Sequence, residues 1–122
     1  MLQFSFNDER PLFSQIAEGL EDAILAGIFP EESQIPSITE MSVNYKINPA
    51  TALKGINLLV EDGIVYKKRG VGMFVSAGAV ERLRKKRRDQ FFDTYVRALI
   101  AEAKRLSLSA EEIQAMIERG FQ

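Results

Sequence analysis

The stretch that decides the fold is residues 36–75, which read PSITEMSVNYKINPATALKGINLLVEDGIVYKKRGVGMFV. Its first half holds the start signals of two helices. Ser37 is followed three residues later by Glu40, which is the spacing of a capping box. Asn48 is a favoured N-cap acceptor, and the Pro49 that follows it is favoured at the first helical position. The sequence therefore predicts one helix starting at Ser37 and a second starting at Asn48, joined by a short turn.

The second half of this stretch predicts the end of the second helix and a β-hairpin. Gly63 follows Asp62 at a point where a left-handed residue often ends a helix, so this helix should stop near Asp62. Two short β-prone runs, residues 64–66 and 73–75, flank a glycine-containing segment that is rich in lysine and arginine. We therefore expect a short hairpin with a positively charged tip.

Two short helices joined by a tight turn and followed by a basic hairpin are typical of a winged helix-turn-helix, in which the second helix enters the major groove of DNA. Four apolar residues of the second helix share one face and form its predicted core side: Ala52, Ile56, Leu59 and Val60. The predicted exposed side carries Ala50, Thr51 and Lys54. The alternative is a small helical domain with a surface hairpin.

The residues before this stretch predict an arm, a third helix and a short strand. The helix should run from Pro11 to about Gly27, because apolar residues recur there every four positions with others beside them: Leu12, Ile16, Leu20 and Ile24, flanked by Phe13, Leu25 and Ile28. An alternating arm that covers part of the core consists of Leu2, Phe4 and Phe6. Residues 34–36 can add a short strand beside the hairpin. We assign the whole winged domain to residues 1–76.

The remaining residues, 77–122, predict a helical tail. A long helix is expected from Ala79 to Leu106, where the sequence has no Pro or Gly, and a last helix follows a second capping box of Ser109 and Glu112. The apolar stripes of these helices need a second copy of the chain to cover them, so we expect a homodimer. The predicted dimer interface consists of Phe91, Phe92, Tyr95, Val96, Leu99, Ile100, Ile113, Met116 and Ile117. The predicted fold class is mainly α with a small β-hairpin: a winged helix-turn-helix domain followed by a short two-helix dimerisation tail.

The charge of the chain is unevenly distributed. The 122 residues have a formal net charge of −1, which by itself argues against a nucleic-acid-binding protein. Nine basic residues and one acidic residue nevertheless lie between Lys67 and Arg88. Salt screens charges over roughly 8 to 10 Å, so this local excess matters more to a phosphate than the total does. The run from Arg82 to Arg88 is either a phosphate contact or a solvated helix face, and the sequence leaves both open.

The composition also limits the chemistry that the chain can perform. It contains no Cys and no His, which removes disulfides, thiolates and imidazole ligands. Asp89 and Asp93 are four residues apart, but charge pairing with Arg97 accounts for them better than a metal ion does. We expect no enzyme activity, metal or cofactor. No uncharged apolar run approaches the ~20 residues of a membrane span, so we expect a soluble, cytoplasmic protein.

Three segments between Pro11 and Val75 read PLFSQIAEGLEDAILAGIF, IPSITEMS and INPATALKGINLLVEDGIVYKKRGVGMFV. Together they resemble the GntR family of bacterial transcription regulators. The NPATA helix start and the short helical tail are most similar to the YtrA subfamily. The resemblance implies a homodimeric repressor that binds a double-stranded DNA operator with an inverted repeat, and it allows an unidentified small-molecule effector.

Many members of that family have an arginine where this chain has Thr39 and another where it has Pro49. The expected base contacts therefore shift to Asn48, Thr51 and Lys54. Arg69 and Gly70 match the family's wing-tip contact. The candidate DNA-binding residues are Ser37, Thr39, Asn48, Ala50, Thr51, Lys54, Lys67, Lys68, Arg69 and Gly70. The alternative function is a winged-helix protein-interaction module without specific DNA binding, in which the basic run is a solvated face.

Overall fold

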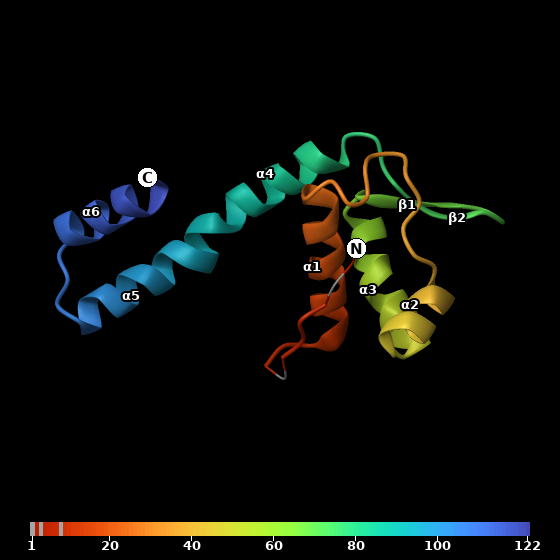
Figure 1. Cartoon of the computed structure of the whole chain (residues 1–122), viewed down its shortest axis with the longest axis horizontal. Coiled ribbons are helices and arrows are strands. Elements are labelled where there is room, and N and C mark those ends of the chain that lie inside the picture. The colour runs from red at the N-terminus through yellow and green to blue at the C-terminus, as the bar shows by residue number, and fades with distance from the viewer. Residues whose placement is uncertain (1, 3, 8) are drawn as a thin grey trace. The chain divides into compact units, whose positions relative to one another are not determined.

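The computed structural model describes residue 2, residues 4–7 and residues 9–122. The chain divides into two compact units, Met1–Lys85 and Lys86–Gln122 (Figure 1). The division falls inside a helix rather than in a loop. The domain boundary that the sequence suggests, after residue 76, lies in the loop before that helix and stays a prediction.

The first unit is a winged helix-turn-helix. It contains α1 (Leu12–Leu25), α2 (Ile38–Tyr45), α3 (Pro49–Glu61), β1 (Val65–Lys68), β2 (Gly72–Val75) and the first part of α4 (Ala79–Phe91). The three helices α1, α2 and α3 lie together, and the hairpin extends from them (Figure 1). Close packing of α1 on α3 depends on Gly55, because a Cβ there would lie 2.9 Å from the carbonyl oxygen of Phe13.

The core of this unit draws apolar side chains from the arm, the helices, the hairpin and α4: Leu2, Ile16, Leu20, Ile24, Ile35, Met41, Ile56, Leu59, Ile64, Val65, Val75 and Leu83. Burial of Leu2 confirms that the arm covers part of the core. The expected burial of Val60 is wrong, since its side chain is 39% exposed. Val60 lies about 100° around the helix from Leu59, beyond the buried arc.

The hairpin pairs β1 with β2 in antiparallel register, from Val65 opposite Val75 to Lys68 opposite Gly72. The short strand expected over residues 34–36 is present only as one bridge, between Gln34 and Phe74. Pro36 has no N–H to donate, which prevents the ladder from continuing beyond that point.

The second unit contains the end of α4, a π-helical turn η1 (Phe92–Val96), α5 (Arg97–Arg105) and α6 (Ala110–Phe121). The predicted long helix is thus correct except for this wide turn. The second capping box is confirmed, since the Glu112 N–H donates to Ser109 Oγ at 3.1 Å and the Ser109 N–H donates to Glu112 Oε1 at 3.2 Å. The predicted fold class is confirmed. In the described part of the chain, no helix has the length and apolar character needed to cross a bilayer.

Candidate nucleic-acid interface

The starts of α2 and α3 are fixed by side-chain caps, as the sequence predicts. The Glu40 N–H donates to Ser37 Oγ at 3.0 Å, and the Ser37 N–H donates to Glu40 Oε1 at 3.1 Å. At α3 the Ala50 N–H donates to Asn48 Oδ1 at 2.9 Å, and Pro49 is the first helical residue. Lys46 turns the chain between the helices with a left-handed φ of 55°. These caps occupy the oxygens of Ser37 and Asn48, and leave the hydroxyl and amide hydrogens of those side chains as their donors.

The outer face of α3 differs from the face that the sequence predicts. Ala50 and Lys54 are exposed as expected, but Thr51 is half-buried. Leu53 and Asn57 are also exposed on this helix, and Leu53 is 46% exposed. Ala50, Leu53 and Asn57 are spaced by three and four residues, so they share one helix face. That spacing is the signal in the sequence that could have identified Leu53 and Asn57.

Lys54 is held against a neighbouring helix. Its Nζ lies 4.1 Å from the centre of the Phe13 ring, at the start of α1. A cation over an aromatic face is stabilised by roughly 0.5 to 1 kcal/mol at an exposed site. The ammonium group of Lys54 therefore has a protein partner on the α1 side of α3.

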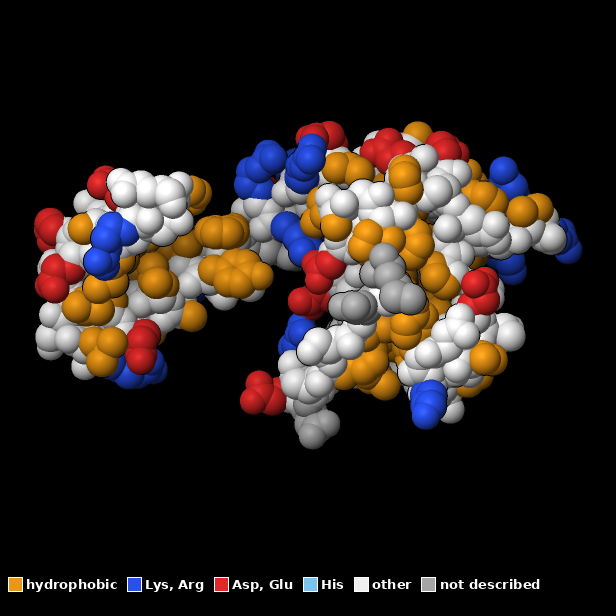
Figure 2. Space-filling view, viewed as in Figure 1, with side chains coloured by type: hydrophobic (Ala, Val, Ile, Leu, Met, Phe, Trp, Pro, Cys, Tyr) orange, Lys and Arg blue, Asp and Glu red, His pale blue; other side chains and the backbone are white. Residues whose placement is uncertain are grey.

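The hairpin of β1 and β2, which we call the wing, ends in a tight turn with basic residues. Lys67, Lys68, Arg69 and Gly70 are all exposed, and Lys68 Nζ lies 4.6 Å from the centre of the Phe74 ring. The Val71 N–H donates to the Lys68 carbonyl oxygen at 2.9 Å and closes the turn. Blue side chains mark the end of the hairpin in the space-filling view (Figure 2). The wing thus presents cationic groups on a short, hydrogen-bonded support.

Two side chains from the loop before α2 support the wing from its side. The Gln34 amide nitrogen donates to the Val71 carbonyl oxygen at 3.1 Å. The Tyr66 hydroxyl donates to Glu32 Oε2 at 2.8 Å, and this hydrogen bond raises the pKa of Tyr66 above its ordinary value of 10.0. These contacts connect the hairpin to residues more than thirty positions earlier, so the wing is part of the folded unit.

The start of α4 is attached to the same unit by a carboxylate. Glu31 accepts hydrogen bonds from the N–H groups of Gly78, at 2.8 Å, and Val80, at 3.1 Å. Because these donors stabilise the charged form, they lower the pKa of Glu31 below its ordinary value of 4.5. The Arg82 guanidinium donates to the Gly63 carbonyl oxygen, at the end of α3.

The basic run of α4 is thus partly engaged with the protein. Arg82 is bound to Gly63, and Arg84 pairs with Glu81 at 2.6 Å. Both contacts are exposed, and they leave the choice between phosphate contact and solvated face open for the rest of the run. On the next helical turns Arg97 pairs with Asp93 at 2.6 Å, as the sequence indicates. Among the residues described, no cluster of three acidic side chains that could hold a metal ion is found.

The second unit presents an apolar surface, which we call the tail surface. Seven of its predicted interface residues are exposed and two are half-buried: Phe91, Phe92, Tyr95, Leu99, Ile100, Met116 and Ile117 in the first group, Val96 and Ile113 in the second. Leu106 and Phe121 also belong to it, at 60% and 88% exposure. Orange side chains gather over α5 and α6 in Figure 2. Phe121 follows Ile117 by four residues, and this helical spacing already indicates that it belongs to the surface.

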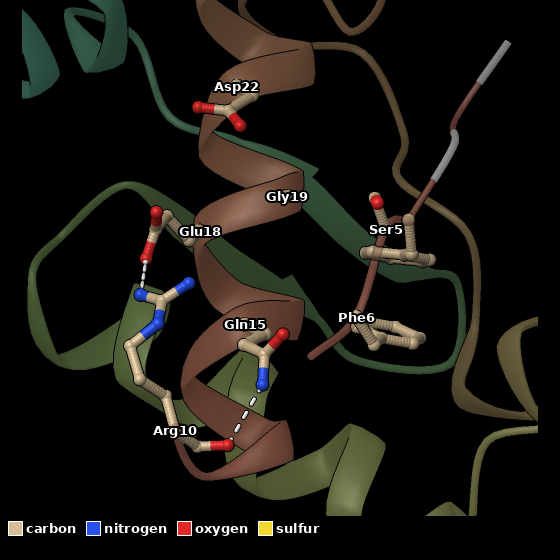
Figure 3. Close-up of a pocket in the computed structure, with 8 residues that line it drawn as sticks. Ser5, Phe6, Arg10, Gln15, Glu18, Gly19 and Asp22 are labelled. Atoms are coloured by element: carbon tan, nitrogen blue, oxygen red, sulfur yellow. Dashed lines mark hydrogen bonds and ion pairs between the residues drawn. The ribbon is translucent and has the colours of Figure 1, made fainter. Parts of the chain in front are cut away.

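A cleft of about 190 Å³ lies between the N-terminal arm and α1 (Figure 3). Arg10 pairs with Glu18 at 2.6 Å, and the Gln15 amide donates to the Arg10 carbonyl oxygen at 2.8 Å. Phe4 lies on Gly19, where an added Cβ would come within 2.7 Å of the ring. These contacts hold the arm against α1, so the cleft is the space left where the arm packs on this helix.

Comparison with known proteins concerns mainly the winged unit. Residues 12–75 match the family described as "Bacterial regulatory proteins, gntR family". The chain is 29% identical over 79 residues to the HTH-type transcriptional repressor YtrA of Bacillus subtilis (strain 168), a match that covers 65% of this chain. The chain spans 61% of the length of YtrA.

Several solved structures are similar to this chain, and two of them bear on its function. A GntR-family protein from Bacteroides thetaiotaomicron superposes with a TM-score of 0.74 at 32% identity, over 91% of this chain and 96% of that one. The DNA-binding domain of AraR, in complex with operator ORX1, superposes with a TM-score of 0.56 at 26% identity, over 62% of this chain and 96% of that one. The first likeness includes most of the tail, and the second is with a domain bound to DNA.

Proposed function

Because the chain belongs to the gntR family of bacterial regulatory proteins, we propose that it is a sequence-specific DNA-binding transcription regulator. The observation that carries the proposal is the family match over residues 12–75, which covers α1, α2, α3 and both strands of the wing. The same match confirms the family that the sequence motifs indicate. YtrA bears the description of a repressor, which supports repression as the mode of action.

In this proposal α3 enters the major groove and the wing follows the neighbouring phosphates. The starts of α2 and α3 supply Ser37, Thr39, Asn48, Ala50 and Thr51, all at or near helix N-termini where backbone N–H groups attract phosphate. Residues 49–56 include no acidic side chain, so this end of α3 does not repel DNA. The operator-bound AraR domain supports the proposal by its similar fold.

In the same proposal the lysine and arginine side chains of α3 and the wing contact DNA phosphates. Lys67, Lys68 and Arg69 are exposed on the wing, and Lys54 lies on the side of α3 next to Phe13. Long cationic side chains in such places neutralise phosphates without reading sequence. Gly70, with a φ of 77° and no atom within 4 Å of an added Cβ, lets the backbone of the turn approach the groove closely.

We further propose that the regulator is a homodimer formed through the tail surface. Phe91, Phe92 and Tyr95 are each more than half exposed, contiguous apolar surface of this kind marks interaction sites, and a second copy offers an equivalent patch across a two-fold axis. Helix-turn-helix dimers address half-sites about 34 Å apart, so the operator is expected to be an inverted repeat. The same proposal places the protein in the cytoplasm, because the operator DNA is there.

The experiment that tests this function is a footprint on the promoter of the chain's own gene, followed by fluorescence polarisation at two salt concentrations. A protected inverted repeat that outcompetes random DNA of equal length supports the proposal. Equal affinity for every duplex, or no binding at low salt, contradicts it. Absence of DNA binding at low salt would favour a winged helix that acts as a protein-interaction module.

A further inference from the structure

The outer face of α3 presents an apolar side chain where a polar reading group would be expected. Leu53 is 46% exposed and shares a helix face with Ala50, three residues before it, and with Asn57, four residues after it. A single exposed leucine is ordinary on a protein surface. Leu53 becomes informative because of its position in the middle of the helix that is proposed to enter the groove.

Two polar side chains close to Leu53 contact the protein, while Asn57 is exposed one turn further along the helix. The Lys54 ammonium lies 4.1 Å from the Phe13 ring centre, and the Asn48 oxygen accepts the Ala50 N–H. Thr51 is half-buried. The exposed side chains of the first two turns of α3 are those of Pro49, Ala50, Leu53 and Lys54, so three of the four are apolar and Leu53 is the largest of these three.

The major groove contains one apolar group that such a face can recognise. Among the four base pairs, only those with thymine carry a methyl group at the groove edge; the other features there are hydrogen-bond donors and acceptors. We infer that Leu53 is a specificity-determining residue that contacts the 5-methyl group of thymine in the operator. This inference rests on the proposed DNA-binding function and deepens it, because it names the chemical group that is read.

The experiment uses the full chain and a DNA duplex recovered by it from a randomised library. Each thymine of the selected site is replaced in turn by uracil, which removes the methyl group and keeps the base pairing. The wild-type protein is expected to bind at least one uracil duplex about fourfold more weakly, the fold-change that corresponds to one buried methyl group. Polarisation measures the affinity for each duplex.

Leu53→Ala provides the second arm of a double-mutant cycle. This variant should bind the thymine duplex more weakly than wild type, and it should no longer distinguish thymine from uracil at the sensitive positions. Ile28→Ala is the matched control, because Ile28 is also exposed, at 41%, and lies outside α3. It should keep the wild-type response to uracil. Thermal unfolding of each variant verifies that the fold is retained.

Three results overturn the inference. If wild type is indifferent to uracil at every position, no methyl group is read. If Leu53→Ala keeps the full response to uracil, another residue reads it. If no sequence is enriched from the library, the proposed function fails and this inference fails with it, whereas the first two results leave the proposed function intact.

Discussion

Single side chains on the wing carry charges that can follow a phosphate backbone. Arg69 lies in the turn between β1 and β2 and is exposed, whereas the Lys68 ammonium is located above the Phe74 ring. An arginine in such a turn keeps its full charge and has five N–H donors. It is therefore the residue of the wing whose contribution to DNA binding is easiest to isolate.

We expect Arg69→Ala to flatten the salt dependence of DNA binding. Each phosphate contact that is lost lowers the slope of log affinity against log salt concentration by about 0.9. Specific and nonspecific duplexes should lose similar affinity, and Arg69→Lys should retain most of the slope. Polarisation titrations at several salt concentrations measure this slope. An unchanged slope in Arg69→Ala would mean that the turn is only solvated.

The residue scale also explains which parts of the site the sequence could predict. Ser37 and Asn48 cap their helices through atoms only two or three residues away, so the local sequence contains all the information. The position of Lys54 depends on how α1 packs on α3, and the partial burial of Thr51 also depends on packing that no local pattern specifies. Leu53 has the helical spacing of an exposed face, but its amino-acid type is usual in a helix core and hides that signal.

At the scale of elements, the wing and α4 are fixed by groups from the loop before α2. Gln34 supports the wing turn, and Glu31 caps α4. Sequence patterns predict each of these elements but not the contacts between them, because the partners are separated by more than thirty positions. The strand expected over residues 34–36 illustrates this limit, since it is reduced to a single bridge at Gln34, beside which the Ile35 N–H donates to the Met73 carbonyl oxygen.

The wing should be sensitive to substitution at Gly72 and tolerant at Gly70. Gly72 has a φ of 146°, and an added Cβ would lie 2.3 Å from the Gln34 amide nitrogen. Gly72→Ala should therefore cost about 1 to 3 kcal/mol of folding stability. Gly70→Asn is the control, because a φ of 77° with open space suits asparagine. Urea unfolding of both variants compares them, and equal stability would show that the backbone at position 72 does not require glycine.

The Glu31 cap of α4 should make stability depend on pH in a defined direction. The pKa of Glu31 is lowered in the folded protein, so its contribution is fully present above the ordinary pKa of 4.5 and is lost as pH falls through the lower, folded value. Glu31→Gln should be less stable than wild type at neutral pH, and the two curves should converge in acid. Thermal unfolding from pH 7 to pH 2 measures the difference. A difference that stays constant over that range would exclude the charge as its origin.

For the whole molecule, the important quantity is the apolar area that one copy leaves uncovered. The sequence predicts the tail surface because its stripes have helical spacing, and nine predicted residues are exposed or half-buried in the single chain. Sequence periodicity cannot say what covers such a surface. The exposure of its aromatic side chains favours a second copy, and the oligomeric state tests this directly.

Phe92→Asp should prevent the proposed dimer from forming. A carboxylate placed in a desolvated contact costs several kcal/mol, so the variant should have the mass of one 13.7 kDa chain at micromolar concentration, where wild type is expected to have twice that mass. Thr94→Asp adds the same charge at an exposed polar residue of the same turn and should remain dimeric. Light scattering gives both masses. A wild-type monomer, or a dimeric Phe92→Asp, would contradict a tail-mediated dimer.

The π-helical turn at Phe92–Val96 changes the course of the aromatic side chains along the helix surface. In an ordinary α-helix, residues four apart advance about 40° beyond a full turn, so a row spaced in fours winds around the axis. A turn closed by an i to i+5 hydrogen bond holds more residues per turn and removes most of that advance. At this turn the Phe91 and Tyr95 rings lie beside each other, with ring centres 5.2 Å apart. The wide turn therefore reduces, over Phe92–Val96, the winding of side chains spaced four apart around the helix axis. Deleting one residue there would restore the ordinary α-helical winding.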